Sequence, residues 1–273
     1  MVNVFTVDIE DWQHSRINFS ENNHWSCQNT RILDNLDAIL EILADRNIKA
    51  TFFVLGCIAE RLPEILIKID KKGHEIGSHG YQHKLLYTLT PDEFEQDLIK
   101  SLKIIEGILH KKVLSFRAPY WSVTEESLWA IDILQKNGLL YDSSIYPTKN
   151  FLYGIPDEPV IPHLVKKDLL EFPGSTIRVL GRNIPVGGGF FLRVFPYFWT
   201  KWAIRSLNQR GYPCMVYLHP HEVDEYNYAC PGSVKENFIL KFGKGRMKKK
   251  ILQLLSDFKF SSLSEVAHTI SLK

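Results

Sequence analysis

The sequence has few cysteines, and they do not follow the patterns that staple small secreted domains or bind metal. The four cysteines, Cys27, Cys57, Cys214 and Cys230, lie far apart and form no Cys-x-x-Cys pair. Disulfide frameworks and thiolate zinc sites both depend on closely patterned cysteines, so neither is indicated. We therefore expect reduced thiols and a cytoplasmic protein.

The sequence also lacks a membrane-spanning run and a strong excess of charge. No apolar stretch approaches the roughly 20 residues of a transmembrane helix, and Met1 leads into a strand-like run without the features of a signal peptide. The formal net charge is only +2. Since nucleic-acid-binding domains are usually basic, no nucleic-acid partner is expected. The basic segment 244–250 is typical of a solvated helix face, with attraction to anionic lipid at the inner membrane face as the alternative.

What the sequence does have is enough apolar residues for a large core, arranged in alternating runs. Of its 273 residues, 45% are hydrophobic and 12% aromatic, which argues against disorder. The pattern predicts strands at 2–9, 50–55, 75–78, 113–116 and 214–218, and helices near 32–43, 63–72, 90–109, 124–138, 196–210 and 247–257. Strands separated by such helices pair in parallel, so we predict an α/β fold in one barrel-like domain, residues 1–273. A Gly- and Pro-rich region at about 146–195 is predicted to form loops and short strands over the core.

Five polar clusters follow the predicted strands, at the edge where parallel barrels assemble their active sites. The first contains Asp8, Glu10 and Asp11. Alternation along a strand puts Asp8 and Glu10 on the same side, where two carboxylates repel each other unless they share a cation or a proton. Solvated acids at a strand end are the structural alternative.

The second cluster contains His79 and His83 in a glycine-flanked loop. Two imidazoles four residues apart can converge on one ion, and with carboxylate oxygen they suit Zn²⁺ or a similar divalent metal. The spacing alone is weak evidence, because ten histidines will sometimes fall at this separation. His74 is interpreted as structural.

The remaining clusters are centred on Arg117, Asp142 and His219. Arg117 at a strand end can hold a carboxylate bidentately and keep it ionised as a base, although a surface Arg before a proline turn is common. Asp142 is either a turn residue or the residue that orients a catalytic histidine. His219 is a candidate to protonate a leaving amine and is favoured over His221 because it lies nearer the strand; a plain loop histidine is the alternative.

Several aromatic and glycine residues are candidates for the substrate-binding walls. Aromatic faces suit the C–H surface of a sugar ring, although core or lid packing is an equally good interpretation. A glycine run lets a loop approach a substrate closely, or forms a flexible turn. The candidates are Tyr120, Trp121, Tyr153, Gly188, Phe190 and Phe191.

Taken in order, these clusters resemble the polysaccharide deacetylase family, also called the NodB-homology or carbohydrate esterase family 4 group. The likeness spans most of the chain. It rests on Asp8, Ala50-Thr-Phe-Phe53, Gly73-His-Glu-Ile-Gly-Ser-His79, Arg117-Ala-Pro-Tyr120, Asp142-Ser-Ser144 and Leu218-His-Pro220. The segments 8–12, 153–156, 180–183 and 187–189 look like the branch found in exopolysaccharide gene clusters.

The resemblance implies a distorted (β/α) barrel with fewer than eight strands. It also implies a hydrolase that uses a divalent metal, expected to be Zn²⁺, to remove an N-acyl group, usually acetyl, from an amino sugar. The substrate would be an N-acetylated saccharide of polysaccharide or glycan biosynthesis. A polymer, a lipid-linked unit and a nucleotide sugar all remain open, as does assembly into a homo-oligomer.

The resemblance also implies a role for each of the candidate residues. Asp8 falls on the base, Arg117 on the residue that holds it, and His219 on the general acid. The two histidines of the second cluster fall on metal ligands. The common family form has two adjacent aspartates, which this sequence lacks, so the third ligand is either Glu10 or Asp11.

Two other functions are weighed against this one. The same barrel hydrolyses cyclic amides and ureides in allantoinase-like enzymes, sometimes without metal. A catalytically inactive saccharide-binding protein is the other alternative. The presence of a candidate base, both histidines, Arg117 and His219 argues against an inactive site.

Overall fold

The computed structural model describes residues 1–14, 30–148, 150, 153–224, 226 and 234–270, with the side chains of residues 235 and 236 excepted. Among these, Cys57 and Cys214 are free thiols. The other two cysteines of the sequence, Cys27 and Cys230, lie outside the described residues. No helix in the described part of the chain is long and apolar enough to cross a membrane.

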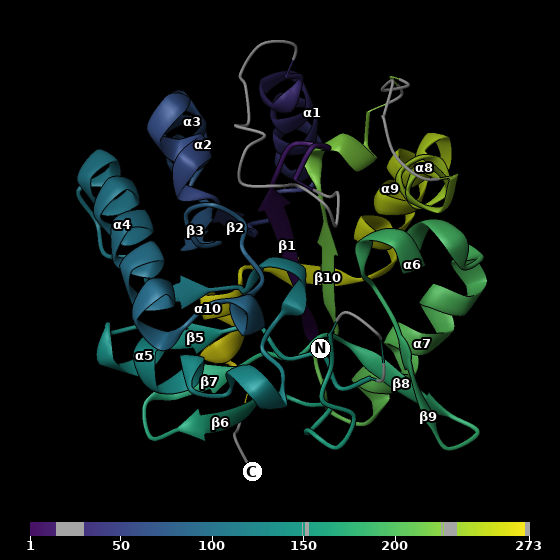
Figure 1. Cartoon of the computed structure of the whole chain (residues 1–273). Helices are drawn as coiled ribbons and strands as arrows, with labels where there is room; N and C mark the ends of the chain where they lie inside the picture. The colour runs from purple at the N-terminus through teal and green to yellow at the C-terminus, as the bar shows by residue number, and fades with distance from the viewer. Residues whose placement is uncertain (15–29, 149, 151–152, 225, 227–233, 271–273) are drawn as a thin grey trace.

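Seven parallel strands form the curved sheet at the centre of the molecule (Figure 1). In spatial order they are β10 (Met215–Leu218), β1 (Val2–Ile9), β2 (Thr51–Val54), β3 (Glu75–Ser78), β4 (Ser115–Phe116), β5 (Tyr141–Asp142) and β7 (Leu169–Glu171). At one edge of this set, β6 (His163–Lys166) pairs antiparallel with β7. Off this path, β11 (Lys259–Ser261) is a further parallel strand and pairs with the first residues of β1. Within the described residues β7 and β10 do not pair, so the predicted incomplete α/β barrel is confirmed.

The helices connect these strands and lie around the sheet (Figure 1). They are α1 (Ile32–Ala44), α2 (Gly56–Arg61), α3 (Glu64–Lys71), α4 (Pro91–Leu109), α5 (Ala130–Lys136), α6 (Gly189–Val194), α7 (Tyr197–Gln209), α8 (Val234–Lys241), α9 (Met247–Asp257) and α10 (Leu263–Ala267). The main apolar core draws on both ends of the chain, from Phe5 of β1 to Leu254 of α9 and Phe260 of β11. The assignment of residues 1–273 to one domain stays a prediction.

Local sequence explains several of these boundaries. The longest helix, α4, starts with a capping box in which Thr90 Oγ1 accepts from the Glu93 amide and the Glu93 carboxylate accepts from the Thr90 amide. Gly73 and Gly138 follow the ends of α3 and α5 with φ of 71° and 80°, the left-handed region that glycine adopts most readily. The capping box and the two glycines can be recognised in the sequence alone.

The helix predicted at 124–138 is wrong in its first half. A short 3-10 turn at Glu125–Ser127 comes first, and α5 begins only at Ala130. Ser127 Oγ accepts from the Thr124 amide and lies 2.9 Å from the Ser122 carbonyl. Such local side-chain bonds compete with the helical ladder, which explains the interruption.

The Gly- and Pro-rich region at 146–195 contains short strands, as predicted, and also a helix, α6, that was not predicted. It holds β6, β7, a hairpin of β8 (Thr176–Val179) and β9 (Arg182–Pro185), and α6. The helices α2, α8 and α10 and the strand β11 were also not predicted. These elements are short, and short segments carry little periodicity.

The fold gathers the ends of the parallel strands at one edge. Asp8 is the residue before the last one of β1, and His79, Arg117 and His219 directly follow β3, β4 and β10. Parallel pairing therefore brings together residues that are more than 200 positions apart in the sequence, at the edge that carries the active site in related barrels.

Candidate active site

A buried ion pair joins the first and third polar clusters. Arg117 Nη1 donates to Asp8 Oδ1 at 2.7 Å, and the two side chains are 0% and 4% exposed. The same nitrogen donates to Thr6 Oγ1 at 2.8 Å, and Nη2 donates to Ser143 Oγ at 3.0 Å. Arg117 is thus held by residues of β1 and by Ser143, which follows β5. The second carboxylate oxygen of Asp8, Oδ2, takes no part in this ion pair.

Aromatic rings surround the Arg117 guanidinium. Its Cζ lies 4.3 Å from the Phe53 ring centroid, 4.6 Å from that of Trp121 and 5.6 Å from that of Tyr217. A cation over aromatic faces is stabilised by the ring quadrupole, which offsets part of the cost of removing Arg117 from water. The position of this cation is therefore fixed by packing as well as by charge.

Glu10 and the two histidines of the second cluster lie close together and could act as the ligands of one metal ion. Glu10 Oε1 lies 2.8 Å from His79 Nε2 and 2.8 Å from His83 Nε2, and all three side chains are buried. Burial raises the pKa of Glu10, but the neighbouring imidazoles outweigh it and hold this pKa well below its usual range. The carboxylate is therefore ionised at neutral pH.

The tautomer of His79 supports a cation in this group. His79 Nδ1 lies 2.7 Å from the Arg117 carbonyl oxygen, which can only accept, so Nδ1 carries the proton. In the neutral ring, Nε2 then turns a lone pair toward Glu10 Oε1. That contact is repulsive unless a proton or a cation lies between the two atoms. Two imidazole nitrogens and a carboxylate oxygen, all within 4.8 Å of one another, suit Zn²⁺ or a similar ion.

Asp11 lies outside this group. Its Oδ2 accepts from Thr30 Oγ1 at 2.5 Å, and its amide donates to His14 Nδ1 at 3.1 Å. Neither of the groups of candidate ligand atoms found among the described residues includes Asp11. Of the two acids that the sequence left open as third ligand, the geometry favours Glu10.

His219 faces the acids of β1 across the pocket. Its Nε2 lies 4.0 Å from Asp8 Oδ2 and 4.0 Å from Glu10 Oε1. Burial lowers the pKa of His219, but the charge of Glu10 and the hydrogen bond and charge of Glu222 raise it to about 9. His221 stacks behind His219 with ring centroids 5.4 Å apart, and burial lowers the pKa of His221 to about 3. His219 is the histidine placed to give up a proton.

Asp142 bonds within its own loop, which favours the turn interpretation over the alternative that it orients a catalytic histidine. Asp142 Oδ1 accepts from the Ser143 amide at 2.8 Å and from Ser144 Oγ. Burial raises the pKa of Asp142 to about 6 and that of neighbouring Glu171 well above its usual range. This carboxyl pair supports the loop that carries Ser143, and the acid beside His219 Nδ1 is Glu222, at 3.2 Å.

The clusters open into a cavity of about 320 Å³ whose other walls are mostly aromatic. Phe190, Phe191 and Tyr153 line it, as do Tyr120 and Trp121. Trp121 is only 4% exposed and packs on neighbouring rings, so its contribution to the wall is small.

Gly188 was expected to let a loop approach the substrate, but it approaches Tyr217 instead. A Cβ on Gly188 would lie 2.1 Å from Tyr217 Cε1, and the Tyr217 amide donates to the Gly187 carbonyl at 2.9 Å. The neighbouring Gly189 lines the cavity. The glycine run therefore serves close packing of the loop against β10.

Three residues with left-handed backbone lie at the site. His83, Tyr120 and Trp121 have φ of 59°, 54° and 56°. Residues other than glycine adopt this conformation at an energetic cost, and such strain concentrates at functional sites. Here it turns His83 toward Glu10 and brings Tyr120 to the cavity wall.

Three residues near the cluster were missed from the sequence. His14 is buried with its ring centroid 5.8 Å from that of His83, and burial and the charge of His83 lower its pKa to about 3. Its carbonyl accepts from the Tyr120 hydroxyl at 2.8 Å. Glu222 and Arg193, which lie behind His219, were not singled out either. The three-residue spacing of His219 and Glu222 was a local signal, whereas nothing local pointed to Arg193.

Two family models match the chain. Residues 29–139 match the model described as polysaccharide deacetylase, and residues 143–268 match a domain of unknown function, DUF3473. The peptidoglycan-N-acetylglucosamine deacetylase of Bacillus cereus is 32% identical over 160 residues, 54% of this chain and 56% of that protein. The chitooligosaccharide deacetylase of Azorhizobium caulinodans is 33% identical over 103 residues, 37% of this chain and 48% of that protein. The chain thus spans about half the length of these relatives.

Solved structures share the fold. The peptidoglycan deacetylase PdaC of Bacillus subtilis superposes with a TM-score of 0.51 at 17% identity, covering 98% of this chain and 91% of that one. Puue allantoinase superposes with a TM-score of 0.61 at 14% identity, covering 97% of this chain and 88% of that one. At these identities the likeness concerns the fold alone.

Proposed function

We propose that the chain is a metal-dependent hydrolase of the polysaccharide deacetylase family, whose model matches residues 29–139, and that it removes N-acetyl groups from an amino-sugar-containing saccharide. The observation that carries the proposal is the convergence of three groups at one sheet edge. These are the Asp8–Arg117 ion pair, the Glu10–histidine group and His219. The deacetylase relatives act on peptidoglycan and chitooligosaccharides by name, which supports an N-acetylated substrate.

We assign the metal to Glu10, His79 and His83, with Zn²⁺ as the expected ion because two imidazoles and one carboxylate are its usual ligands. A bound divalent cation would supply Lewis-acid chemistry to the amide carbonyl and to the attacking water. His79 is oriented for this by its Nδ1–H bond to the Arg117 carbonyl.

The protein side chains would handle the protons. Asp8, with Oδ1 held by Arg117, accepts the proton of the attacking water at Oδ2 as the C–O bond forms. The backbone N–H of Tyr120 is a candidate donor to the developing oxyanion. His219 donates its Nε2 proton to the nitrogen as the C–N bond breaks, which yields acetate and the free amine. The aromatic walls, including Phe190, would contact the sugar ring.

A saccharide carried on a lipid is the form of substrate that the surface favours. Phe238 and Phe242 of the α8 region are 52% and 40% exposed, and Ile239 and Leu240 between them line the cavity. Residues 237–256 contain six Lys or Arg and no acid. Exposed aromatics beside basic residues suit anionic lipid, so we propose peripheral binding at the inner membrane face. We expect the protein to co-sediment with phosphatidylglycerol vesicles but not with phosphatidylcholine vesicles. Binding to neither kind of vesicle, or equal binding to both, would contradict the proposal.

The decisive experiment combines metal content with product analysis. We expect about one divalent ion per chain and acetate release from N-acetylated saccharides, with no turnover of cyclic imides or ureides. The allantoinase-like alternative predicts the reverse substrate preference. A metal-loaded protein that binds a saccharide but releases no acetate from any member of the panel would indicate an inactive site. The cytoplasmic location, the oligomeric state and the exopolysaccharide branch stay predictions.

A further inference from the structure

A buried chain of polar contacts starts at Nδ1 of His219 and leads to Glu222 and Arg193, which also line the cavity. Glu222 Oε2 lies 3.2 Å from His219 Nδ1 and also accepts from the His219 amide at 3.0 Å. Glu222 Oε1 accepts from Arg193 Nε at 2.8 Å. The side chains of Arg193 and Glu222 are 3% and 1% exposed. Water therefore contributes little to fixing these charges, and the contacts among them decide their positions.

Arg193 is held on its other side by the end of α8. Nη1 donates to the carbonyls of Leu240 and Phe242 at 3.3 and 2.7 Å, and Nη2 donates to the Ile239 carbonyl at 2.8 Å. The last carbonyls of a helix have no partner within the helix, and a cation there is favourable. Ile239 and Leu240 line the cavity. One buried guanidinium thus contacts both the support of His219 and the wall of the pocket.

We propose that Glu222 and Arg193 are positioning residues that hold His219 as proton donor, and that Arg193 ties this donor to the pocket wall formed by α8. The inference rests on the proposed function of the site. Glu222 accepts the Nδ1–H of His219, which leaves Nε2 directed toward Asp8 and Glu10 and prevents the ring from flipping. Arg193 in turn fixes the carboxylate of Glu222 by a charge-assisted bond.

The two residues are expected to differ in their kinetic effects. Glu222→Gln keeps the shape of the side chain but removes the charge that orients His219, so kcat should fall with KM nearly unchanged. Arg193→Met removes the support of Glu222 and also the donors to the end of α8. It should therefore lower kcat and raise KM together.

A pair of substrates separates positioning from a general structural effect. An amine leaving group needs a proton, whereas 4-nitrophenolate leaves an acetyl ester without one. In Glu222→Gln we expect hydrolysis of an N-acetylglucosamine oligomer to fall by about 10²-fold, within the range that positioned proton transfer contributes. Hydrolysis of 4-nitrophenyl acetate should stay within about threefold, because it does not use this proton.

Lys250 offers a matched control. It is a buried cation that donates to the carbonyls of Leu192, Arg193 and Phe195, and it does not contact Glu222. Lys250→Met should lower stability as the Arg193 variant does but leave the ratio of amide to ester hydrolysis unchanged. Equal losses on both substrates in Glu222→Gln, or a changed ratio in Lys250→Met, would overturn the proposal.

A spectroscopic measurement distinguishes failure of this inference from failure of the proposed function. The Nδ1–H proton of His219, bonded to a carboxylate, should resonate downfield in the proton NMR spectrum and shift upfield in Glu222→Gln. If this signal is absent from the native protein, the positioning role is wrong whatever the activity. If it is present but no saccharide yields acetate, the geometry stands and the deacetylase function fails.

Discussion

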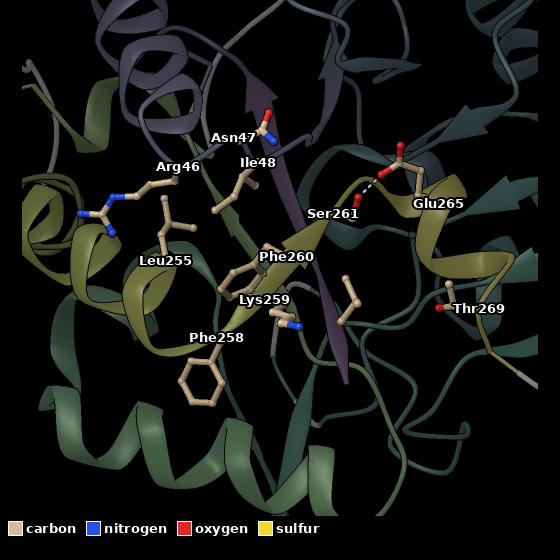
Figure 2. A pocket seen from close by; sticks show the side chains of 11 residues that line it. Arg46, Asn47, Ile48, Leu255, Phe258, Lys259, Phe260, Ser261, Glu265 and Thr269 are labelled. Atoms are coloured by element: carbon tan, nitrogen blue, oxygen red, sulfur yellow. Dashed lines mark hydrogen bonds between the residues drawn. The ribbon is translucent and has the colours of Figure 1, made fainter.

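Two cavities lie at opposite ends of β1, and they differ in how their polar side chains are held. The cavity at the carboxyl end, about 320 Å³, contains Asp8 and Glu10, which are 2% and 4% exposed. The cavity at the amino end has a volume of about 470 Å³, and Figure 2 shows its side chains around β11. Its charged residues, Arg46, Lys259 and Glu265, are all exposed.

The two cavities are distinguished by whether their charged side chains are buried or exposed. Charges exposed to water at the amino end need no partner to be stable. Buried charges at the carboxyl end are costly unless other groups compensate them, and here each has such groups within ion-pair distance. A polypeptide that maintains buried charges at one edge of its sheet does so for binding or catalysis more often than for stability.

From this contrast we expect the largest effect from removing metal. Dialysis against a chelator should reduce acetate release to background, and added Zn²⁺ should restore it. His83→Ala should lower the metal content measured by emission spectrometry, because one ligand of the buried group is lost. Arg46→Gln, at the amino-end cavity, should change neither quantity. Full activity in protein proven free of metal would contradict the assignment.

A single carboxylate should give the next largest effect. Asp8→Asn should lower kcat for deacetylation by about 10²- to 10⁴-fold, the contribution of a positioned base. The fold should persist, because Asn keeps an oxygen that can accept from Arg117. Glu265→Gln at the other end is the matched control and should behave as the native protein. An Asp8→Asn protein with native turnover would remove Asp8 from the reaction.

Packing at the carboxyl end should be less tolerant than elsewhere. Gly188→Ala places a Cβ against the Tyr217 ring and should destabilise the protein by about 1–3 kcal/mol, as overpacking does. Gly107→Ala in α4 meets nothing within 4 Å and should stabilise by about 0.5–1 kcal/mol, because alanine favours helix interiors. Urea unfolding of both variants measures the difference. Equal effects of the same sign would argue against close packing at Gly188.

Buried acids should also make stability depend on pH in a direction opposite to that of paired carboxylates. Burial raises the pKa of Glu171 well above 4.5 and that of Asp142 from 3.8 to about 6. The folded protein then keeps protons on these two acids that the unfolded chain releases above about pH 4, so their contribution to stability should fall as pH rises through about 6. Buried His14 and His221, whose pKa is lowered to about 3, contribute in the opposite direction, so the acid pair is measured by comparison with a variant.

Glu171→Gln should reduce this decrease by an amount on the order of 1–3 kcal/mol, since it removes one of the two acids that must stay protonated. The measurement is the free energy of unfolding at several pH values between 4.5 and 8. The exposed Glu265→Gln should leave the slope as it is. The same pH dependence in the native protein and in Glu171→Gln would show that the pair carries no such linkage.

Local patterns allowed much of the architecture to be predicted. The bounds predicted for β1 and β3 agree with the structure, and those predicted for α9 do as well, because their apolar periodicity is complete within the segment. The capping box at Thr90 likewise allowed the start of α4 to be predicted. Elements of a few residues, such as β11 and α10, were missed because their stability comes from packing against β1 rather than from their own residues.

In the candidate site, too, the sequence indicated the residues but not all of the contacts between them. Asp8, Arg117 and His219 were identified because each stands in a recognisable motif at a strand end. The sequence left Asp142 open as a turn residue or as the residue that orients a catalytic histidine, and the structure instead places Glu222 beside His219 Nδ1. A one-dimensional pattern does not report which carboxylate reaches a ring nitrogen.

The amino-acid sequence by itself determined the class of fold, the family and the residue types available for catalysis, because these follow from periodicity and short motifs. Tertiary structure alone decided which atoms meet. It placed Glu10 rather than Asp11 beside the histidines and Glu222 rather than Asp142 behind His219. The physical reason is that hydrogen bonds and ion pairs act over a few ångströms, and only the curvature of the sheet brings distant strand ends within that range.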